Sequence, residues 1–350
     1  MQLGVFTVVD AYPDRPGGAA DRLVEVVRLA EAVEAAGLHS LWVAEHHFRD
    51  DGVCPSPAVL LAACAMRTER IRLGSLVSVL PFHRPLDVAE EFSVLDRLSG
   101  GRLNFGVGSG YLASEFEGFG VDPAEKRARF DRALATILEA FGGSAVRADG
   151  PAAVPVRLNV RPVQQPHPPV WIAVQRPEAI PHVARRGASL ALIPYATVAS
   201  IEELGTQIRA YRAALPDGAA AQVTVAVHLY VGERPELARA AFHRYVESRL
   251  RSGSTFLQRK VTERPEHASP DAIEASGLAL FGSGRSVVAG LERLEGIGVD
   301  EVLGIVDFGG LDPAEVARSV SALGAAWGAR AAAPTAGPTT VARESGRNGL

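Results

Sequence analysis

The stretch that decides the fold is SLWVAEHHF, residues 40–48. Its first five residues form an apolar run that is typical of a buried strand. A carboxylate and two imidazoles follow at once, so they lie just beyond the end of this strand. In parallel α/β folds the loops at that end converge over a rigid rim, and chemistry takes place there. Glu45, His46 and His47 are therefore candidate catalytic residues. The alternative is that one histidine only caps the strand or binds a neighbouring carbonyl.

The alternation of strand and helix continues on both sides of this stretch. Eight short apolar runs are expected strands, at residues 3–9, 40–44, 71–77, 103–107, 170–174, 190–192, 223–231 and 301–305. Amphipathic patterns between them predict helices at residues 21–36, 85–98, 126–141, 201–214, 235–250, 285–294 and 313–323. Eight such units favour a closed (β/α)8 TIM barrel over an open doubly wound sheet. The scarcity of glycine after the first strand also argues against a dinucleotide-binding fold.

Three segments interrupt this rhythm. Residues 142–167 are rich in Gly, Ala and Pro and predict a short irregular excursion. Residues 251–284 are a long polar insertion, of the kind that forms a lid or is disordered. Residues 329–350 have no apolar periodicity and predict a flexible tail. We therefore expect a single barrel domain over residues 1–328 with a mobile lid at 251–284.

Composition excludes several classes of function. The 350 residues are 47% apolar, which is ample for one large core, and the net charge of −4 gives no basic surface for nucleic acid or membranes. No apolar run reaches the ~18 residues of a membrane-spanning helix, and we expect no secretory leader. The two cysteines, Cys54 and Cys64, lack metal-ligand spacing and suit a reducing cytoplasm. We expect a cytoplasmic protein without a metal site.

A second informative stretch is LNFGVGSGY, residues 103–111, in which glycines gather at a strand exit. Gly108 and Gly110 flank Ser109 there. Glycine lets a backbone approach a ligand closely and present its N–H groups. Tight packing at the barrel rim is the alternative explanation.

Five segments taken in order resemble the bacterial luciferase-like family of flavin-dependent monooxygenases. They are EHHF at 45–48, LPFHRP at 80–85, residues 95–111, QQPHPPVWIA at 164–173 and GVDEV at 298–302. The resemblance covers about residues 1–325, and the family's TIM barrel agrees with the strand count above. It implies a site for reduced FMN, or in some branches for the deazaflavin F420, at the C-terminal mouth of the barrel. It also implies that O2 reacts with reduced FMN to a C4a-(hydro)peroxyflavin, from which one oxygen atom passes to a small organic substrate.

The resemblance assigns roles to individual residues. His46 takes the position of the active-site histidine near the flavin, where an imidazole can donate or shuttle a proton near neutral pH. Glu45 is then placed to set its tautomer or charge, and His47 is the more structural of the pair. Phe6, Val77 and Tyr111 are expected, by position alone, to face the flavin or the substrate.

The chain departs from the luciferase pattern at the flavin phosphate. The luciferase has an arginine where this chain has Ser109. The second half of the phosphate site should lie just after the fifth strand, at residues 174–179, which include Val174, Gln175 and Arg176. We hypothesise that Arg176 supplies the charge, while Ser109 and the N–H groups of Gly108 and Gly110 supply direct bonds. The alternative is that Arg176 is a solvated surface residue.

Three functions remain open on these grounds. The first is an FMN-dependent monooxygenase whose reduced flavin comes from a separate reductase, because no nicotinamide-binding fingerprint is present. The second is an F420-dependent oxidoreductase on the same barrel. The third is a non-catalytic luciferase-like subunit. The resemblance also implies a homodimer, whereas the sequence does not identify the organic substrate.

Overall fold

The computed structural model describes residues 1–12, 18–49, 51–147, 154–252 and 255–332. Eight parallel strands close into a barrel: β1 (Gln2–Thr7), β2 (Ser40–Val43), β3 (Arg72–Ser75), β5 (Leu103–Gly108), β8 (Val170–Val174), β9 (Ser189–Leu192), β10 (Val223–Val231) and β12 (Glu301–Ile305). The ring closes where β9 pairs with β10 and where β12 pairs with both β10 and β1. These are the eight strands that the sequence predicts, and the (β/α)8 barrel is confirmed.

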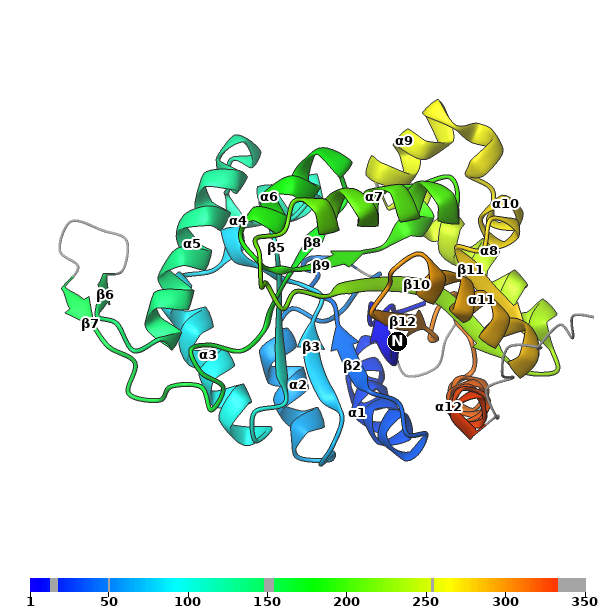
Figure 1. Cartoon of the computed structure of the whole chain (residues 1–350), viewed down its shortest axis with the longest axis horizontal. Coiled ribbons are helices and arrows are strands. Elements are labelled where there is room, and N and C mark those ends of the chain that lie inside the picture. Colours follow the sequence, from blue (N-terminus) through cyan, green and yellow to red (C-terminus); the bar gives the residue numbers. More distant parts are fainter. Residues whose placement is uncertain (13–17, 50, 148–153, 253–254, 333–350) are drawn as a thin grey trace, which may run out of the picture.

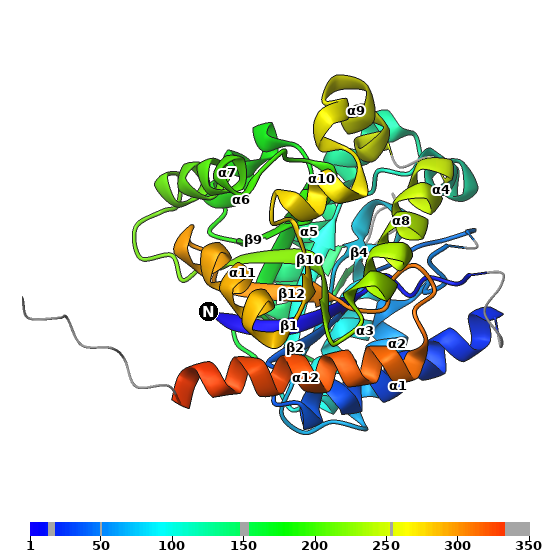
Figure 2. The ribbon, with the colours of Figure 1, turned by 90° about the vertical axis from the view of Figure 1, so that its right-hand side faces the viewer.

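Helices surround the barrel (Figures 1 and 2). The larger ones are α1 (Gly18–Ala35), α2 (Pro57–Ala65), α3 (Pro85–Leu98), α5 (Lys126–Phe141), α7 (Ile201–Ala213), α8 (Pro235–Arg251), α11 (Gly284–Gly296) and α12 (Pro313–Ala332). Several begin with proline, whose fixed φ suits the first helical position. Figure 2 shows α12 running alongside α1 under the barrel, so the two ends of the barrel domain lie side by side.

Packing inside the barrel depends on glycines that face large aromatic rings. Gly74 pairs with Trp42 across β2 and β3, and a Cβ atom at Gly74 would lie 2.2 Å from the Trp42 indole. Trp42 and Trp171 are buried and meet edge to face, with ring centroids 5.1 Å apart. This layer fills the barrel below its mouth, so a ligand has room only at the C-terminal ends of the strands.

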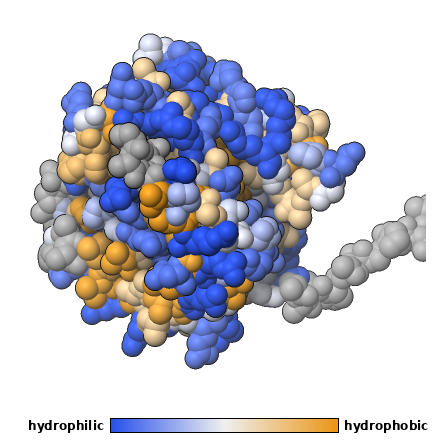
Figure 3. All heavy atoms as spheres, turned by 90° about the vertical axis from the view of Figure 1, so that its left-hand side faces the viewer, coloured by the Kyte–Doolittle hydropathy of each residue, from blue (hydrophilic) through white to orange (hydrophobic). Residues whose placement is uncertain are grey.

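Short elements depart from the regular barrel. The excursion at 142–167 contains a small hairpin of β6 (Val146–Arg147) and β7 (Pro155–Val156). Figure 3 shows the side of the molecule on which this hairpin lies, where hydrophilic and hydrophobic side chains are intermixed. Among the helices of the described residues, none is long and apolar enough to cross a lipid bilayer.

The described part of the insertion at residues 251–284 contains regular secondary structure. Its elements are α9 (Thr255–Glu263), η5 (Pro265–His267), α10 (Pro270–Ala275) and the strand β11 (Ala279–Gly282). Strand β11 is not among the eight strands that the sequence predicts; it is buried and pairs with the end of β10. The first four residues of the expected tail, 329–332, belong to helix α12, which ends at Ala332; residues 333–350 lie outside the described part of the chain.

Candidate active site

A cavity of about 460 Å3 opens at the C-terminal ends of the strands. This size is within the range of small-molecule sites. Every site residue that the sequence predicts lines it except His47; the lining members are Phe6, Glu45, His46, Val77, Gly108, Ser109, Gly110, Tyr111, Val174, Gln175 and Arg176. The strand-exit argument therefore places these side chains together, while their individual roles stay predictions.

His46 lies on the loop that follows β2 and is held from two sides. Its Nδ1 atom is 3.0 Å from Oε1 of Glu115, which also accepts the backbone N–H of His47 at 3.1 Å. Gly52, with φ of 117°, packs so closely that a Cβ there would lie 2.9 Å from the His46 ring. When Glu115 is ionised, Nδ1 must donate to it, and Nε2 is then the atom that can exchange a proton.

The sequence had suggested Glu45 as the residue that sets the state of His46, and this was wrong. Glu115 makes that contact. It lies on α4 (Ala113–Phe119), 69 positions along the chain, and is 2% exposed. Its spacing from His46 carries no local signal, because only the barrel brings the two loops together.

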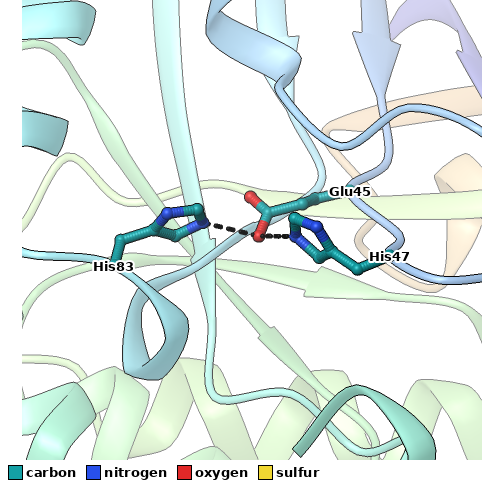
Figure 4. A group of neighbouring side chains, drawn as sticks. All are labelled: Glu45, His47 and His83. Atoms are coloured by element: carbon teal, nitrogen blue, oxygen red, sulfur yellow. Dashed lines mark hydrogen bonds and ion pairs between the residues drawn. The ribbon is translucent and has the colours of Figure 1, made fainter. Parts of the chain in front are cut away.

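Glu45 instead joins two other histidines (Figure 4). Its Oε1 atom lies 2.9 Å from Nε2 of His47 and 2.7 Å from Nε2 of His83, and its Oε2 accepts the N–H of Val79. Burial opposes ionisation of Glu45, but the bonds from both imidazoles outweigh it and the pKa of this carboxyl is lowered. For His83 the same bond outweighs burial and raises the pKa of the imidazole.

The donor atoms of Glu45, His47 and His83 lie within 4.8 Å of one another, close enough to hold a metal ion. Each ring Nε2 already lies at hydrogen-bonding distance from the carboxylate. Hydrogen bonding therefore accounts for the geometry without an ion. His47 also packs edge to face on Phe82 and Phe119, outside the cavity, in a structural setting.

One end of the cavity is cationic. Arg176 and Lys126 both line it together with Ser109. Nζ of Lys126 lies 3.5 Å from the carbonyl of Gly110, and among the described residues no carboxylate is found in an ion pair with either cation. Burial and the nearby Arg176 charge lower the pKa of the Lys126 ammonium. Two neighbouring cations without a counter-ion form a site for an anion. Lys126 was missed from the sequence, because at the start of an amphipathic helix it reads as a solvated residue.

The backbone at this end is shaped for close approach. Gly110 follows β5 with φ of 73°, a conformation that favours glycine. A Cβ at Gly108 would lie 2.6 Å from a methyl group of Val77. At the exit of the neighbouring strand β8, Oε1 of Gln175 is buried and has no hydrogen-bond partner among the described residues. An unpaired buried amide oxygen is costly, so Gln175 is suited to accept an N–H of a bound ligand.

The remaining wall comes from η4 (Pro194–Ala196), α8 and α9, and it is aromatic. Tyr195, Tyr245 and Phe256 line the cavity there. Arg249 lies on the same wall, with its guanidinium 4.9 Å from the centre of the Tyr245 ring. It is paired with Asp10 and, at 3.3 Å, with Asp51. None of these four residues was predicted, since they come from helices and loops after the strands.

Together, fold and site define a (β/α)8-barrel protein whose mouth holds a cavity with one cationic end, one aromatic wall and a histidine–glutamate pair at its rim. The chain belongs to the luciferase-like monooxygenase family, whose model matches residues 1–301.

Individual relatives agree with this assignment. The chain is 38% identical to an uncharacterised protein, y4wF, of Sinorhizobium fredii over 54% of this chain and 56% of that one, so this match spans about half of the relative. It is 24% identical to the oxygenase component of a flavin-dependent trigonelline monooxygenase of Acinetobacter baylyi, over 81% of this chain and 83% of that one.

Solved structures give the same result. The monooxygenase RslO1 from Streptomyces bottropensis superposes with a TM-score of 0.77 at 26% identity, covering 95% of this chain and all of that one. Structures that share the fold at 16 to 18% identity include one with FMN bound and others that depend on F420. At such identities the likeness shows the fold alone.

Proposed function

We propose that the protein is the oxygenase component of a two-component system that uses reduced FMN and O2 to oxygenate a small organic substrate. The observation that carries this proposal is the cationic end of the cavity, Arg176 and Lys126, within the same cavity as His46. Reduced FMN carries a phosphate, which the cationic end of the cavity would bind. Its reaction with oxygen needs a group that exchanges protons, and His46 would be that group.

The residues present fit this cofactor from end to end. Arg176, Lys126 and the Ser109 hydroxyl would hold the phosphate, together with N–H groups of the glycine-dense turn. The apolar strand ends that carry Phe6 and Val77 offer a surface for the ring system. The orphaned oxygen of Gln175 offers an acceptor for a ring N–H. The phosphate would thus be bound by Arg176, as the sequence suggests, and by a second cation, Lys126.

Reduced FMN, when bound, would supply two electrons and the position at which O2 is activated. The chain's own residues would do the rest. His46 would hold or move a proton at Nε2, with Glu115 fixing its Nδ1 side. The lid helix α9 would exclude water, because Phe256 lies edge to face on Tyr111 with ring centroids 5.6 Å apart.

A separate reductase is the proposed source of the reduced flavin. The sequence has no nicotinamide-binding fingerprint. The relative in Acinetobacter baylyi is itself described as an oxygenase component. Addition of NADH and FMN without a reductase should therefore leave the flavin oxidised, while reduced FMN added directly should react.

Two alternatives remain, and one experiment separates all three. F420 carries a phosphate as well and would use the same cationic end, but it needs no oxygen. A non-catalytic subunit would have no use for the buried His46–Glu115 pair. The test is an anaerobic titration of the purified protein with reduced FMN and with reduced F420, followed by admission of oxygen. Tight binding of reduced FMN with reoxidation kinetics different from those of free flavin supports the proposal. Selective F420 binding, or binding of neither, overturns it.

A further inference from the structure

The aromatic wall of the cavity differs from the cationic end in charge. Among the described residues, Arg249 is the cation found over a phenol ring of this wall, and its charge is balanced by Asp10 and Asp51. Asp51 also pairs with Arg49 at 3.0 Å. Two guanidinium groups thus meet two carboxylates, so Arg249 adds no net charge to the wall. Lys260 of α9 donates to the backbone carbonyl of Tyr195 and does not line the cavity. An anionic substrate would lose its hydration there without gaining a free cation.

The wall offers neutral hydrogen-bond donors. Burial raises the pKa of Tyr111 to about 12 and raises the pKa values of Tyr195 and Tyr245 above their ordinary range, so all three phenols keep their protons. Tyr195 donates to the Tyr245 hydroxyl over 3.5 Å. Within the described residues, no hydrogen-bond acceptor is found for the hydroxyl protons of Tyr245 and Tyr111. Both can therefore donate to an oxygen on a ligand.

The rings of this wall are held in place from behind. His228 is fully buried, and within the described part of the chain neither of its ring nitrogens has a hydrogen-bond partner. Burial lowers the pKa of this imidazole far enough to keep it neutral. Its ring packs against Tyr195 at 5.0 Å and Tyr245 at 4.4 Å between centroids. A neutral imidazole here acts as an aromatic spacer, and the tyrosines in front of it present fixed faces and edges.

Phe256 closes the same space from the lid. It is half-buried against the core on α9 and contacts Tyr111. Ring faces and edges on both sides of a cavity favour a flat ligand with its own aromatic quadrupole over a puckered one of equal size.

We propose that the substrate is a neutral compound with a planar aromatic ring and an oxygen that accepts a hydrogen bond, bound on the wall of Tyr195, Tyr245 and Phe256. This inference rests on the proposed function, because it assigns the cationic end of the cavity to the cofactor. The ring packs among the aromatic side chains, and the oxygen accepts a hydrogen bond from Tyr245 or Tyr111. An anionic substrate is disfavoured because Asp10 and Asp51 already balance the charge of Arg249.

The test is anaerobic isothermal titration calorimetry of the protein saturated with reduced FMN, using four matched probes. These are 1-tetralone, its saturated counterpart 1-decalone, tetralin without the oxygen, and the anion 1-naphthoate. We expect 1-tetralone to bind about tenfold more tightly than 1-decalone and more tightly than the other two. Equal or tighter binding of 1-decalone, or tightest binding of 1-naphthoate, overturns the proposal.

Two variants test whether the probes bind on the aromatic wall. Tyr245→Phe should weaken 1-tetralone about fivefold and leave tetralin unchanged, since only the hydroxyl is lost. Phe256→Leu, on the lid, should narrow the preference for 1-tetralone over 1-decalone. If Tyr245→Phe leaves the affinity for 1-tetralone unchanged and Phe256→Leu leaves the preference for 1-tetralone over 1-decalone unchanged, the aromatic wall is not the binding surface.

Failure of the proposed function gives a different pattern. If reduced FMN does not bind but the apoprotein still prefers 1-tetralone, the cofactor assignment fails and the ligand chemistry stands. If reduced FMN binds and reacts with oxygen but the four probes show no aromatic preference, only the present inference fails.

Discussion

The Nδ1 atom of His46 lies 3.0 Å from the Oε1 atom of Glu115, although the two residues stand 69 positions apart in the chain. This contact fixes which ring nitrogen of His46 faces its partner and which remains for proton exchange. The candidate catalytic histidine is thus oriented by a residue on α4, the short helix that follows the glycine-dense turn.

The Glu115→Gln change should slow oxygen-dependent reoxidation of bound reduced FMN by about tenfold or more. The amide can still accept from Nδ1, but it no longer carries the charge that favours proton uptake by the ring. Affinity for reduced FMN should stay within about twofold. Stopped-flow absorbance after anaerobic loading measures both. Glu117→Gln, an exposed change on the same helix, is the control; equal rates for the two variants would contradict the assigned role of Glu115.

Removing the cations at the phosphate end should weaken FMN selectively. Arg176→Ala and Lys126→Ala should each lower affinity for reduced FMN by about tenfold, and the double variant by about a hundredfold, because each loses a charge-assisted bond to phosphate. Reduced riboflavin has no phosphate and should bind all variants alike. Arg129→Ala serves as the control, because Arg129 is exposed and paired with Glu125. Equal losses for FMN and riboflavin would show that these cations act on something other than the phosphate.

The barrel could be predicted because each of its units is encoded locally. Residues 126–141 and 85–98 carry apolar side chains at helical spacing, and the helices α5 and α3 have those same bounds. Strand β11 was missed because it is only four residues long, ALFG, and lies within a largely polar segment. Its strand character comes from pairing with the long β10, which no local pattern reveals.

The site could be predicted only in its strand-exit part. Glu45 and His46 follow a strand directly, so topology alone carries them to the rim. Glu115, Lys126 and Tyr245 lie on helices, and whether a helical residue faces the mouth depends on how that helix packs. The pairing of Glu45 with His83 was missed for the same reason, since it joins loops 38 residues apart.

A buried carboxyl far from the cavity should make stability fall as pH rises. Burial raises the pKa of Glu301 to about 7, although Ser40 and Arg72 partly oppose this. The unfolded chain loses this proton near its ordinary value, from pH 4.5 upwards, while the folded protein keeps it to about pH 7. Stability is therefore lost across that window, by about 3 kcal/mol in all.

Glu301→Gln should remove that loss. Urea unfolding should show the variant more stable than the parent by about 1–3 kcal/mol at pH 8 and nearly equal to it at pH 4. Glu139→Gln, an exposed change on α5, controls for the general effect of removing a charge. A variant less stable than the parent at pH 8 would mean that the folded protein needs the Glu301 charge.

The position of α9, the proposed lid helix, should depend on one lysine. Nζ of Lys260, on α9, donates to the carbonyl of Tyr195 over 2.8 Å, and burial lowers the pKa of this ammonium to about 8. Lys260→Met keeps the apolar stem but loses this bond, so hydrogen exchange across residues 255–263 should speed up about tenfold. Arg259→Met, on the same helix, removes only an exposed pair with Glu263 and should leave exchange nearly unchanged. If both variants exchange alike, Lys260 does not hold the lid.

The face of α2 and α3 should form the contact of a homodimer. These neighbouring helices expose large apolar side chains: Val59 and Met66 are each 68% exposed, and Val94 and Leu98 on α3 are 44% and 48% exposed. Val94 and Leu98 are one helical turn apart and therefore form an apolar stripe on one face of α3. Burying such a stripe against a second copy is favourable at about 25 cal/mol per Å2.

Light scattering after gel filtration should give about twice the chain mass of 36.9 kDa. Met66→Lys with Leu98→Lys should return the protein to a monomer without changing its circular dichroism. Leu237→Lys, the same kind of change at a 37% exposed position on α8, should leave the dimer intact. A dimer that survives the paired change would place the contact on another face.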